Sequence, residues 1–167
     1  MLDESSLCIN RLNNYWTLWI HLPHDTNWDL DSYKKICSFE YLEQAVAVLN
    51  YIQETLVVNC MLFIMREDIK PIWEDERNKN GSCIAYKINN RLVHNIWRQM
   101  SMFMVSEILL ETEQTQLDIN GITVSPKKNF CIVKLWFKNV VEDSAPVKIN
   151  KAIPELANFE AIYKRHM

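Results

Sequence analysis

The sequence is 167 residues long, which suits a single domain with a sizeable hydrophobic core. Hydrophobic residues make up 49% of it and charged residues 23%, values typical of a globular protein, and no apolar run approaches the roughly 18–20 residues of a membrane-spanning helix. The net charge of −3 argues against non-specific coating of nucleic acid but is compatible with a local basic pocket.

Hydrophobic periodicity divides the chain into elements. Residues 1–13 are polar and predict a flexible N-terminal tail, and residues 14–167 predict one domain. Alternating apolar residues predict strands, and apolar residues three and four apart predict helices. The predicted strands are 15–22, 60–66, 84–88, 119–124, 130–137 and 159–163. The predicted helices are 39–55 with Ser38 as N-cap, 92–110 and 145–153.

The order of these elements predicts an α+β fold. Several strand pairs are joined by hairpin-length segments, which favours an antiparallel or mixed sheet with helices on one face. Within residues 130–137, Lys134 and Trp136 share a face that we expect to meet another molecule. The residues of the opposite face, expected to pack against helices, are Cys131, Val133, Leu135 and Phe137.

Residues 71–81 form a polar loop that carries one large aromatic residue. Pro71 favours an extended or turn backbone, and Gly81 permits a positive φ. Two interpretations of Trp73 stay open. It packs into the core, as most Trp residues do, as we also expect of Trp16 and Trp97. Alternatively, it is a stacking platform beside the carboxylate of Glu74, an arrangement suited to a flat heterocycle with N–H donors.

Other residues complete a candidate nucleotide site. Trp28 lies on a second polar loop, 23–31, and Lys127 and Lys128 lie on the turn before strand 130–137. Two indole rings can sandwich a base, and a positively charged base adds a cation–π contribution of roughly 0.5–2 kcal/mol. A carboxylate can accept two N–H hydrogen bonds from a guanine edge, and lysines can neutralise phosphates. Spacing alone does not show that these groups converge.

The chain resembles the translation initiation factor 4E family of mRNA cap-binding proteins. The most specific segment is 68–81, with Pro-x-Trp-Glu-Asp followed by Asn-Lys-x-Gly, and the likeness covers nearly the whole chain past the tail. Further matching segments are 14–19, Trp28, 49–52, Trp97, 135–136 and 163–166. The resemblance implies a curved antiparallel sheet with about three helices on its convex back and a cap pocket on its concave face.

The resemblance also assigns roles to the candidate residues. Trp28 and Trp73 would sandwich the 7-methylguanine base, Glu74 would bind its Watson–Crick edge, and Trp136 would contact the methyl group. The phosphate contacts would come from Lys127, Lys128 and Lys134. No catalytic residue, metal or cofactor is implied.

The phosphate contacts depart most from the family pattern. Cys83 stands where the family usually has an Arg, and the turn 125–128 replaces a basic Arg-x-Lys with a shift of one residue. Ile132 stands at the family's strand lysine in the ungapped alignment, and Lys134 on the same face would take its place. Because Lys is a point charge where Arg presents a planar fork, we expect phosphate geometry to be read less strictly.

The surface expected to bind a scaffold subunit departs as well. Val46 stands at the position of a helix-borne Trp that anchors such partners, and Arg98 and Gln99 replace a Leu-Glu pair. Two outcomes stay open. In the first, the chain binds ordinary scaffold peptides weakly or uses its own matching partner. In the second, Leu42, Val46 and Met102 rebuild an apolar groove. The full expected surface is Leu42, Val46, Arg98, Gln99 and Met102.

Three functions remain under consideration. The first is cap binding in translation initiation, with capped mRNA and a scaffold subunit of the initiation factor 4G type as partners. The second is a cap-sequestering repressor whose back does not engage the scaffold. The third is an enzyme using Glu74, Asp75 or Glu76 with a metal. It is disfavoured because the sequence has no His/Asp metal cluster or glycine-rich phosphate loop.

The compartment is predicted from the cysteines and the N-terminus. The five cysteines are scattered without a Cys-x-x-Cys pair, which favours a reducing environment over a zinc site or a disulfide framework. The N-terminal residues show no signal-peptide pattern. We therefore expect a monomeric cytoplasmic protein without membrane contact. His21, His24 and His94 lack metal-ligand spacing and are expected to be surface or hydrogen-bonded residues.

Overall fold

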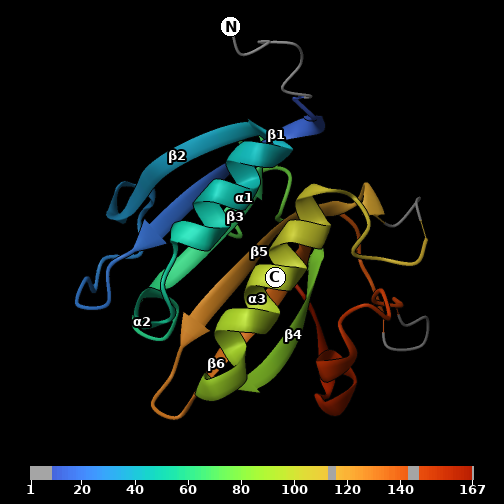
Figure 1. The fold of residues 1–167 in the computed structure, drawn as a ribbon. Helices are drawn as coiled ribbons and strands as arrows, with labels where there is room; N and C mark the ends of the chain where they lie inside the picture. The colour runs from blue at the N-terminus through green and yellow to red at the C-terminus, as the bar shows by residue number, and fades with distance from the viewer. Residues whose placement is uncertain (1–8, 113–115, 143–146, 167) are drawn as a thin grey trace, which may run out of the picture.

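One seven-stranded sheet organises the chain, with helices on a single face of it (Figure 1). The computed structural model describes residues 9–112, 116–142 and 147–166. All neighbouring strands are antiparallel, in the order β2-β1-β3-β5-β6-β4-β7. The strands are β1 (Arg11–His21), β2 (Tyr33–Tyr41), β3 (Met61–Arg66), β4 (Ser82–Asn89), β5 (Ile119–Pro126), β6 (Phe130–Phe137) and β7 (Ala161–Arg165).

The helices α1, α2 and α3 cover the same face of the sheet (Figure 1). Their bounds, with those of two 3₁₀ segments, are α1 (Leu42–Tyr51), α2 (Glu54–Val57), α3 (Asn90–Val105), η1 (Leu30–Ser32) and η2 (Pro154–Asn158). The α+β architecture predicted from the sequence, with about three helices on the back of an antiparallel sheet, is confirmed. No helix in the described ranges has the length and apolar character needed to cross a membrane.

The main hydrophobic core lies between the sheet and the helices. The apolar side chains of β6 that were expected to face the helices (Cys131, Val133, Leu135 and Phe137) are fully buried there. Trp16 of β1 and Trp97 of α3 are fully buried in the same cluster, as predicted. Burial of one Leu-sized side chain contributes roughly 1.5–3 kcal/mol, so this layer is the main source of stability.

A smaller apolar cluster lies on the opposite face, which we call the open face because no helix of the described residues lies on it. Its buried members are Phe63, Met65, Ile69 and Trp136, with Trp19, Tyr33 and Met61 packed against them. The central strands therefore bury side chains on both faces. This explains why residues 62–66 of β3 are all buried instead of alternating with exposed positions.

The second strand was missed by the sequence analysis. β2 is an edge strand paired only with β1, and its first half is exposed, including Lys34 and Lys35. Charged edge strands show no clear apolar alternation, so the pattern gave no signal. The predicted helix 39–55 is also wrong at both ends. α1 starts at Leu42, and Ser38 is a strand residue bonded to the Thr17 hydroxyl at 2.9 Å instead of an N-cap.

Other boundaries differ from prediction. β1 begins at Arg11, inside the predicted tail, whose residues 1–8 lie outside the described chain. α3 ends at Val105, because Glu107 adopts a positive φ of 58°, so Ile108 lies beyond the helix and is exposed. The predicted helix 145–153 is wrong for residues 147–153, which are not helical, while 145–146 lie outside the described residues.

Gly121 allows β3 and β5 to approach closely on the open face. A Cβ atom at this position would lie 2.4 Å from Met65 Sδ and 2.6 Å from the Ile64 carbonyl oxygen. Met65 is fully buried and Ile64 belongs to a paired strand, so neither contact relieves easily.

We expect Gly121→Ala to lower the free energy of unfolding by about 1–3 kcal/mol, the typical effect of overpacking a buried site. Urea denaturation monitored by circular dichroism would measure it. Ser125→Ala, on the same strand, removes an oxygen instead of adding a carbon and should cost less. Equal stability of Gly121→Ala and the parent protein would contradict the close approach.

Candidate functional site

The strand register maps the residues of the open face. Paired residues of antiparallel strands point their side chains to the same side. Trp136 of β6 pairs with Gly121 on β5 and with Cys83 on β4, and Cys83 pairs with Lys164 on β7. Lys134, two residues before Trp136, shares this face. The register therefore brings two lysines to the same side as Trp136.

Trp136 is firmly fixed within this face. Only 9% of its surface is exposed, and its indole Nε1–H donates to the Thr123 hydroxyl oxygen at 2.8 Å. The ring of His166 lies 5.1 Å away, tilted by 56°. A buried indole whose N–H is hydrogen-bonded is held in a fixed position.

Trp28 lies at another edge of the open face. Its side chain is 58% exposed, and one face of the indole stacks on His21, with ring centroids 4.3 Å apart and parallel planes. The edge-on contacts continue inward from His21 to Tyr33 at 5.0 Å and from Tyr33 to Phe63 at 5.4 Å. A row of rings thus links Trp28 to the apolar cluster of the open face.

Trp73 is 48% exposed on the loop between β3 and β4, so the interpretation that it packs into the core is wrong. Glu74 beside it is also exposed. Burial, and secondly the negative charge of Glu74, raise the pKa of Tyr33. The Glu74 carboxylate therefore acts electrostatically on Tyr33, the ring that packs edge-on against His21.

The Trp73 loop is organised by the fully buried side chain of Asn78. Its Nδ2 donates to the carbonyl oxygens of Lys70 at 3.0 Å and Ile72 at 2.8 Å, while its Oδ1 accepts from Asn120 Nδ2 at 2.9 Å. His166 Nδ1–H donates to the Asn78 carbonyl oxygen at 2.6 Å. The loop is therefore bound to β5 and to the residue that follows β7.

His166 has a lowered pKa. Burial is the main cause, and the nearby Lys134 charge acts in the same direction, while the hydrogen bond to Asn78 opposes them. These effects favour a neutral imidazole whose Nδ1 carries the hydrogen. His166 is thus a structural contact between Trp136 and the Trp73 loop, which the sequence analysis did not identify.

Two lysines lie close to the thiol of Cys83, where the family usually has an Arg. Burial raises the pKa of Cys83, and the charges of Lys134 and Lys164 oppose this rise. Lys164 was not among the predicted phosphate ligands, because only the pairing of β7 with β4 reveals its place. In the described chain, neither ammonium group has a carboxylate partner within 4 Å.

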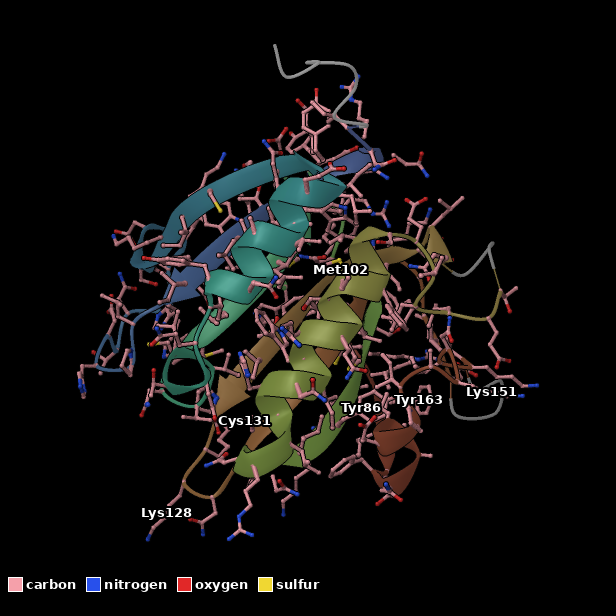
Figure 2. The ribbon with its side chains drawn as sticks, in the orientation of Figure 1. Tyr86, Met102, Lys128, Cys131, Lys151 and Tyr163 are labelled. Atoms are coloured by element: carbon pink, nitrogen blue, oxygen red, sulfur yellow. The ribbon has the colours of Figure 1, made fainter. Side chains whose placement is uncertain are left out.

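The two lysines of the β5–β6 turn have different surroundings. Lys127 lines a cavity of about 190 Å³ together with His21 and Trp28. Lys128 lies at the tip of the hairpin, away from the body of the domain (Figure 2), and lines a separate groove with Lys87 and Phe130. The structure therefore brings Lys127 next to Trp28 and does not bring Lys128 there.

The predicted partner surface lies on the helical side. Val46 of α1 is exposed, and Arg98 of α3 donates to Asn50 of α1 at 2.9 Å, a polar contact between the two helices. Met102 lies on α3 and is partly buried against the main core (Figure 2). A larger apolar cavity of about 900 Å³ lies beside α1 and includes Ile36, but none of the five predicted partner residues lines it.

No group of three His, Cys, Asp or Glu side chains in the described part of the chain is placed to hold a metal ion. Glu74, Asp75 and Glu76 lie on the Trp73 loop, but Asp75 accepts hydrogen bonds from the backbone N–H groups of Lys70 and Arg77, both at 2.9 Å. Glu76 pairs with Lys79 at 2.6 Å. Two of the three carboxylates considered for catalysis thus have local structural partners.

The open face thus carries two exposed loop tryptophans, a buried third and neighbouring lysines. The family model of eukaryotic initiation factor 4E matches residues 11–167. The chain therefore belongs to the eukaryotic initiation factor 4E family.

Curated relatives agree with this assignment. The chain is 29% identical over 136 residues to eukaryotic translation initiation factor 4E of Eremothecium gossypii, covering 77% of this chain and 63% of that protein. It is 27% identical over 143 residues to the Saccharomyces cerevisiae protein of the same name, covering 81% and 64%. The chain spans just under two thirds of the length of these relatives.

Solved structures show the same fold. Caenorhabditis elegans eIF4E-3, in a complex with the 4E-binding protein Mextli and a cap analog, has a TM-score of 0.69 and 27% identity, covering 81% of this chain and 78% of that one. Ascaris suum eIF4E-3 with an m7G cap has a TM-score of 0.78 and 22% identity, covering 95% and 92%.

We expect Asn78→Ala to loosen the Trp73 loop, because it leaves the Lys70 and Ile72 carbonyl groups without their donor. An unsatisfied buried group typically costs about 1–3 kcal/mol. Limited proteolysis should then cleave within residues 67–81 faster than in the parent protein.

Asn80→Ala is the matched control, because Asn80 is an exposed residue of the same loop. It should leave the cleavage rate unchanged. Equal cleavage of Asn78→Ala and Asn80→Ala would show that the buried amide does not organise the loop.

Proposed function

We propose that this protein binds the 7-methylguanosine cap of mRNA in translation initiation. The observation that carries the proposal is the pattern of exposure of its six Trp residues. Trp28 and Trp73, the two expected to stack on the base, are the exposed ones, while the other four are buried or half-buried. Its curated relatives are translation initiation factors, and similar solved structures hold m7G or m2,2,7G caps.

The proposed mode of binding follows from the chemistry of the base. Trp28 and Trp73 stack on the two faces of the methylated guanine, whose positive charge strengthens its attraction to the indole rings. Glu74 accepts hydrogen bonds from the Watson–Crick edge, which presents two N–H donors. Trp136 contacts the methyl group. An unmethylated guanine lacks the charge and the methyl contact, so it binds more weakly.

Lysines take the phosphates in this proposal. Lys127 shares a cavity with Trp28, and Lys134 lies on the same face as Trp136. Both were predicted phosphate ligands, and we keep them in this proposal. Lys164 joins them because it shares that face and lies close to the Cys83 thiol. Lys128, at the hairpin tip, contributes a weaker and more distant charge. Binding is thus electrostatic without the forked contact that an Arg would supply.

We further propose that the α1 and α3 surface binds a scaffold subunit of the initiation factor 4G type or a dedicated counterpart. Similar solved structures hold 4E-binding proteins. The hydrogen bond from Arg98 to Asn50 is a polar contact between α1 and α3, and the exposed Val46 offers less apolar area than the Trp expected at its position. This observation favours the second candidate function, a cap-sequestering repressor with an altered scaffold surface. In both cases we propose a monomeric, cytoplasmic binding protein without catalytic activity.

The first test is quenching of tryptophan fluorescence by 7-methyl-GTP, with GTP as the comparison ligand. We expect strong quenching by the methylated nucleotide and a much weaker response to GTP. Loss of one stacked ring in Trp73→Ala should weaken binding about 5- to 150-fold, from roughly 1–3 kcal/mol of stacking. Glu74→Gln should weaken it too, because the amide cannot accept both N–H bonds.

Glu76→Gln is the matched control for the loop, since Glu76 is an exposed carboxylate whose partner is Lys79. It should bind 7-methyl-GTP as the parent protein does. Equal affinity of the parent protein for 7-methyl-GTP and GTP would overturn the proposed function.

The partner surface can be tested with a peptide of the form Tyr-x-x-x-x-Leu-Φ. We expect affinity weaker than micromolar for the parent protein, because Val46 offers less buried area than a Trp anchor. Val46→Trp should tighten binding. Isothermal titration would measure both, and sub-micromolar affinity of the parent protein would contradict the altered surface.

A further inference from the structure

The structure shows an asymmetry at Trp28. The imidazole of His21 covers one face of its indole ring, with parallel planes and centroids 4.3 Å apart. His21 itself is only 2% exposed, whereas Trp28 is 58% exposed. The covered face therefore belongs to the protein interior, and only the other face is available to a ligand.

We propose that His21 is a positioning residue for the cap site: it holds the Trp28 ring in place and leaves a single face for the base. This inference rests on the proposed cap-binding function for the identity of the ligand. The positioning itself is a property of the unliganded protein and can be tested without a ligand.

His21 contacts both the ring and the backbone of the Trp28 loop. Its Nε2 lies 2.8 Å from the carbonyl oxygen of Asn27, the residue immediately before Trp28. Because a carbonyl oxygen only accepts, His21 Nε2 carries the hydrogen. One side chain thus fixes the backbone at residue 27 and the ring at residue 28.

His21 is in turn held by the sheet. It is the last residue of β1, pairing with Met61 on β3 and with Tyr33 on β2. The Tyr33 ring packs edge-on against it at 5.0 Å. A side chain on a strand that is paired on both sides is held more rigidly than a side chain on a loop.

The Trp28 loop has additional bonds of its own. Asn27 N–H donates to Asp25 Oδ1 at 2.9 Å, and Asp29 N–H donates to Asn27 Oδ1 at 2.8 Å. These contacts shape the backbone but do not touch the indole ring. Among the aromatic ring pairs of the described chain, the stack with His21 is the one that involves the Trp28 ring.

A ring that is already held loses less freedom when a base stacks on it. The cost of immobilising one side chain corresponds to about a 3- to 10-fold change in affinity. We therefore expect His21→Ala to weaken 7-methyl-GTP binding about 3- to 10-fold. His21→Phe keeps a flat ring behind Trp28 and should stay within about 2-fold of the parent protein. His21→Gln keeps an N–H donor without a ring and should resemble His21→Ala.

A double-mutant cycle with Trp28→Ala separates positioning from a general effect on the fold. If His21 acts through the Trp28 ring, His21→Ala should cause no further loss of 7-methyl-GTP affinity in the Trp28→Ala background. An equal loss in both backgrounds, or unchanged affinity of His21→Ala in the parent background, would overturn the proposal.

A ligand-free readout keeps this inference distinct from the cap-binding proposal. The ¹⁵N order parameter of the Trp28 indole N–H should fall in His21→Ala and recover in His21→Phe. If the parent protein fails to bind 7-methyl-GTP but shows this pattern, the proposed function is wrong and the positioning role stands. An unchanged order parameter in His21→Ala would overturn the positioning role, whatever the cap affinity.

Discussion

The hydrogen bonds of one buried amide determine how the open face is built. Asn78 has no exposed surface, and its side chain bonds the carbonyl groups of Lys70 and Ile72 in its own loop and the side chain of Asn120 on β5. Its carbonyl oxygen also accepts from Gly81 N–H and from His166. A buried polar group is costly unless its hydrogen bonds are satisfied, so this set of bonds favours the observed loop conformation. Trp73 and Glu74 can be exposed on an ordered loop because Asn78 supplies the order that their own burial would otherwise provide.

The two faces of the sheet divide the work of stability and recognition. The helical face buries the large core, and the open face carries only a small cluster around Phe63 and Trp136. One further buried contact joins the end of β3 to the turn that follows α3. Arg66 forms an ion pair with Glu107 at 3.1 Å, and its guanidinium lies 4.6 Å from the Trp16 ring centroid. Because most apolar side chains are buried on the helical face, the exposed side chains of the open face are available for binding.

Much of this arrangement could be predicted from the sequence, and the failures have physical causes. The alternation in residues 130–137 predicted which side chains lie on each face of β6. Every second residue of this strand is apolar and packs against the helices, which gives a clear period of two. β2 was missed because an edge strand needs no apolar alternation. The predicted helix 145–153 was wrong because Val147, Ile149 and Ile153 pack against the domain from the irregular segment that precedes η2. Short apolar segments of this kind do not distinguish a helix from a packed loop.

The sequence predicted which residues belong to the candidate site better than it predicted which of them are neighbours. Exposure of Trp28 and Trp73 agrees with the stacking interpretation, yet their neighbours came only from the register. Lys164 lies 81 residues after Cys83 in the chain but opposite it in the sheet. His21, expected only to be a surface or hydrogen-bonded residue, has its hydrogen bond and in addition supports an aromatic ring. Contacts between segments that are distant in the sequence do not affect local residue spacing, so neither a periodicity nor a motif predicts them.

The two edge strands carry positive charge, and this has a consequence for how the protein behaves at high concentration. β2 exposes Lys34 and Lys35, and β7 exposes Lys164 as well as Arg165, which pairs with Glu142. A strand from a second chain that tried to extend the sheet at either edge would have to strip water from these groups and bring its own like charges beside them. Edge-to-edge growth into fibrils is therefore disfavoured. The partly apolar open face can stay exposed without the sheets of neighbouring molecules pairing at their edges.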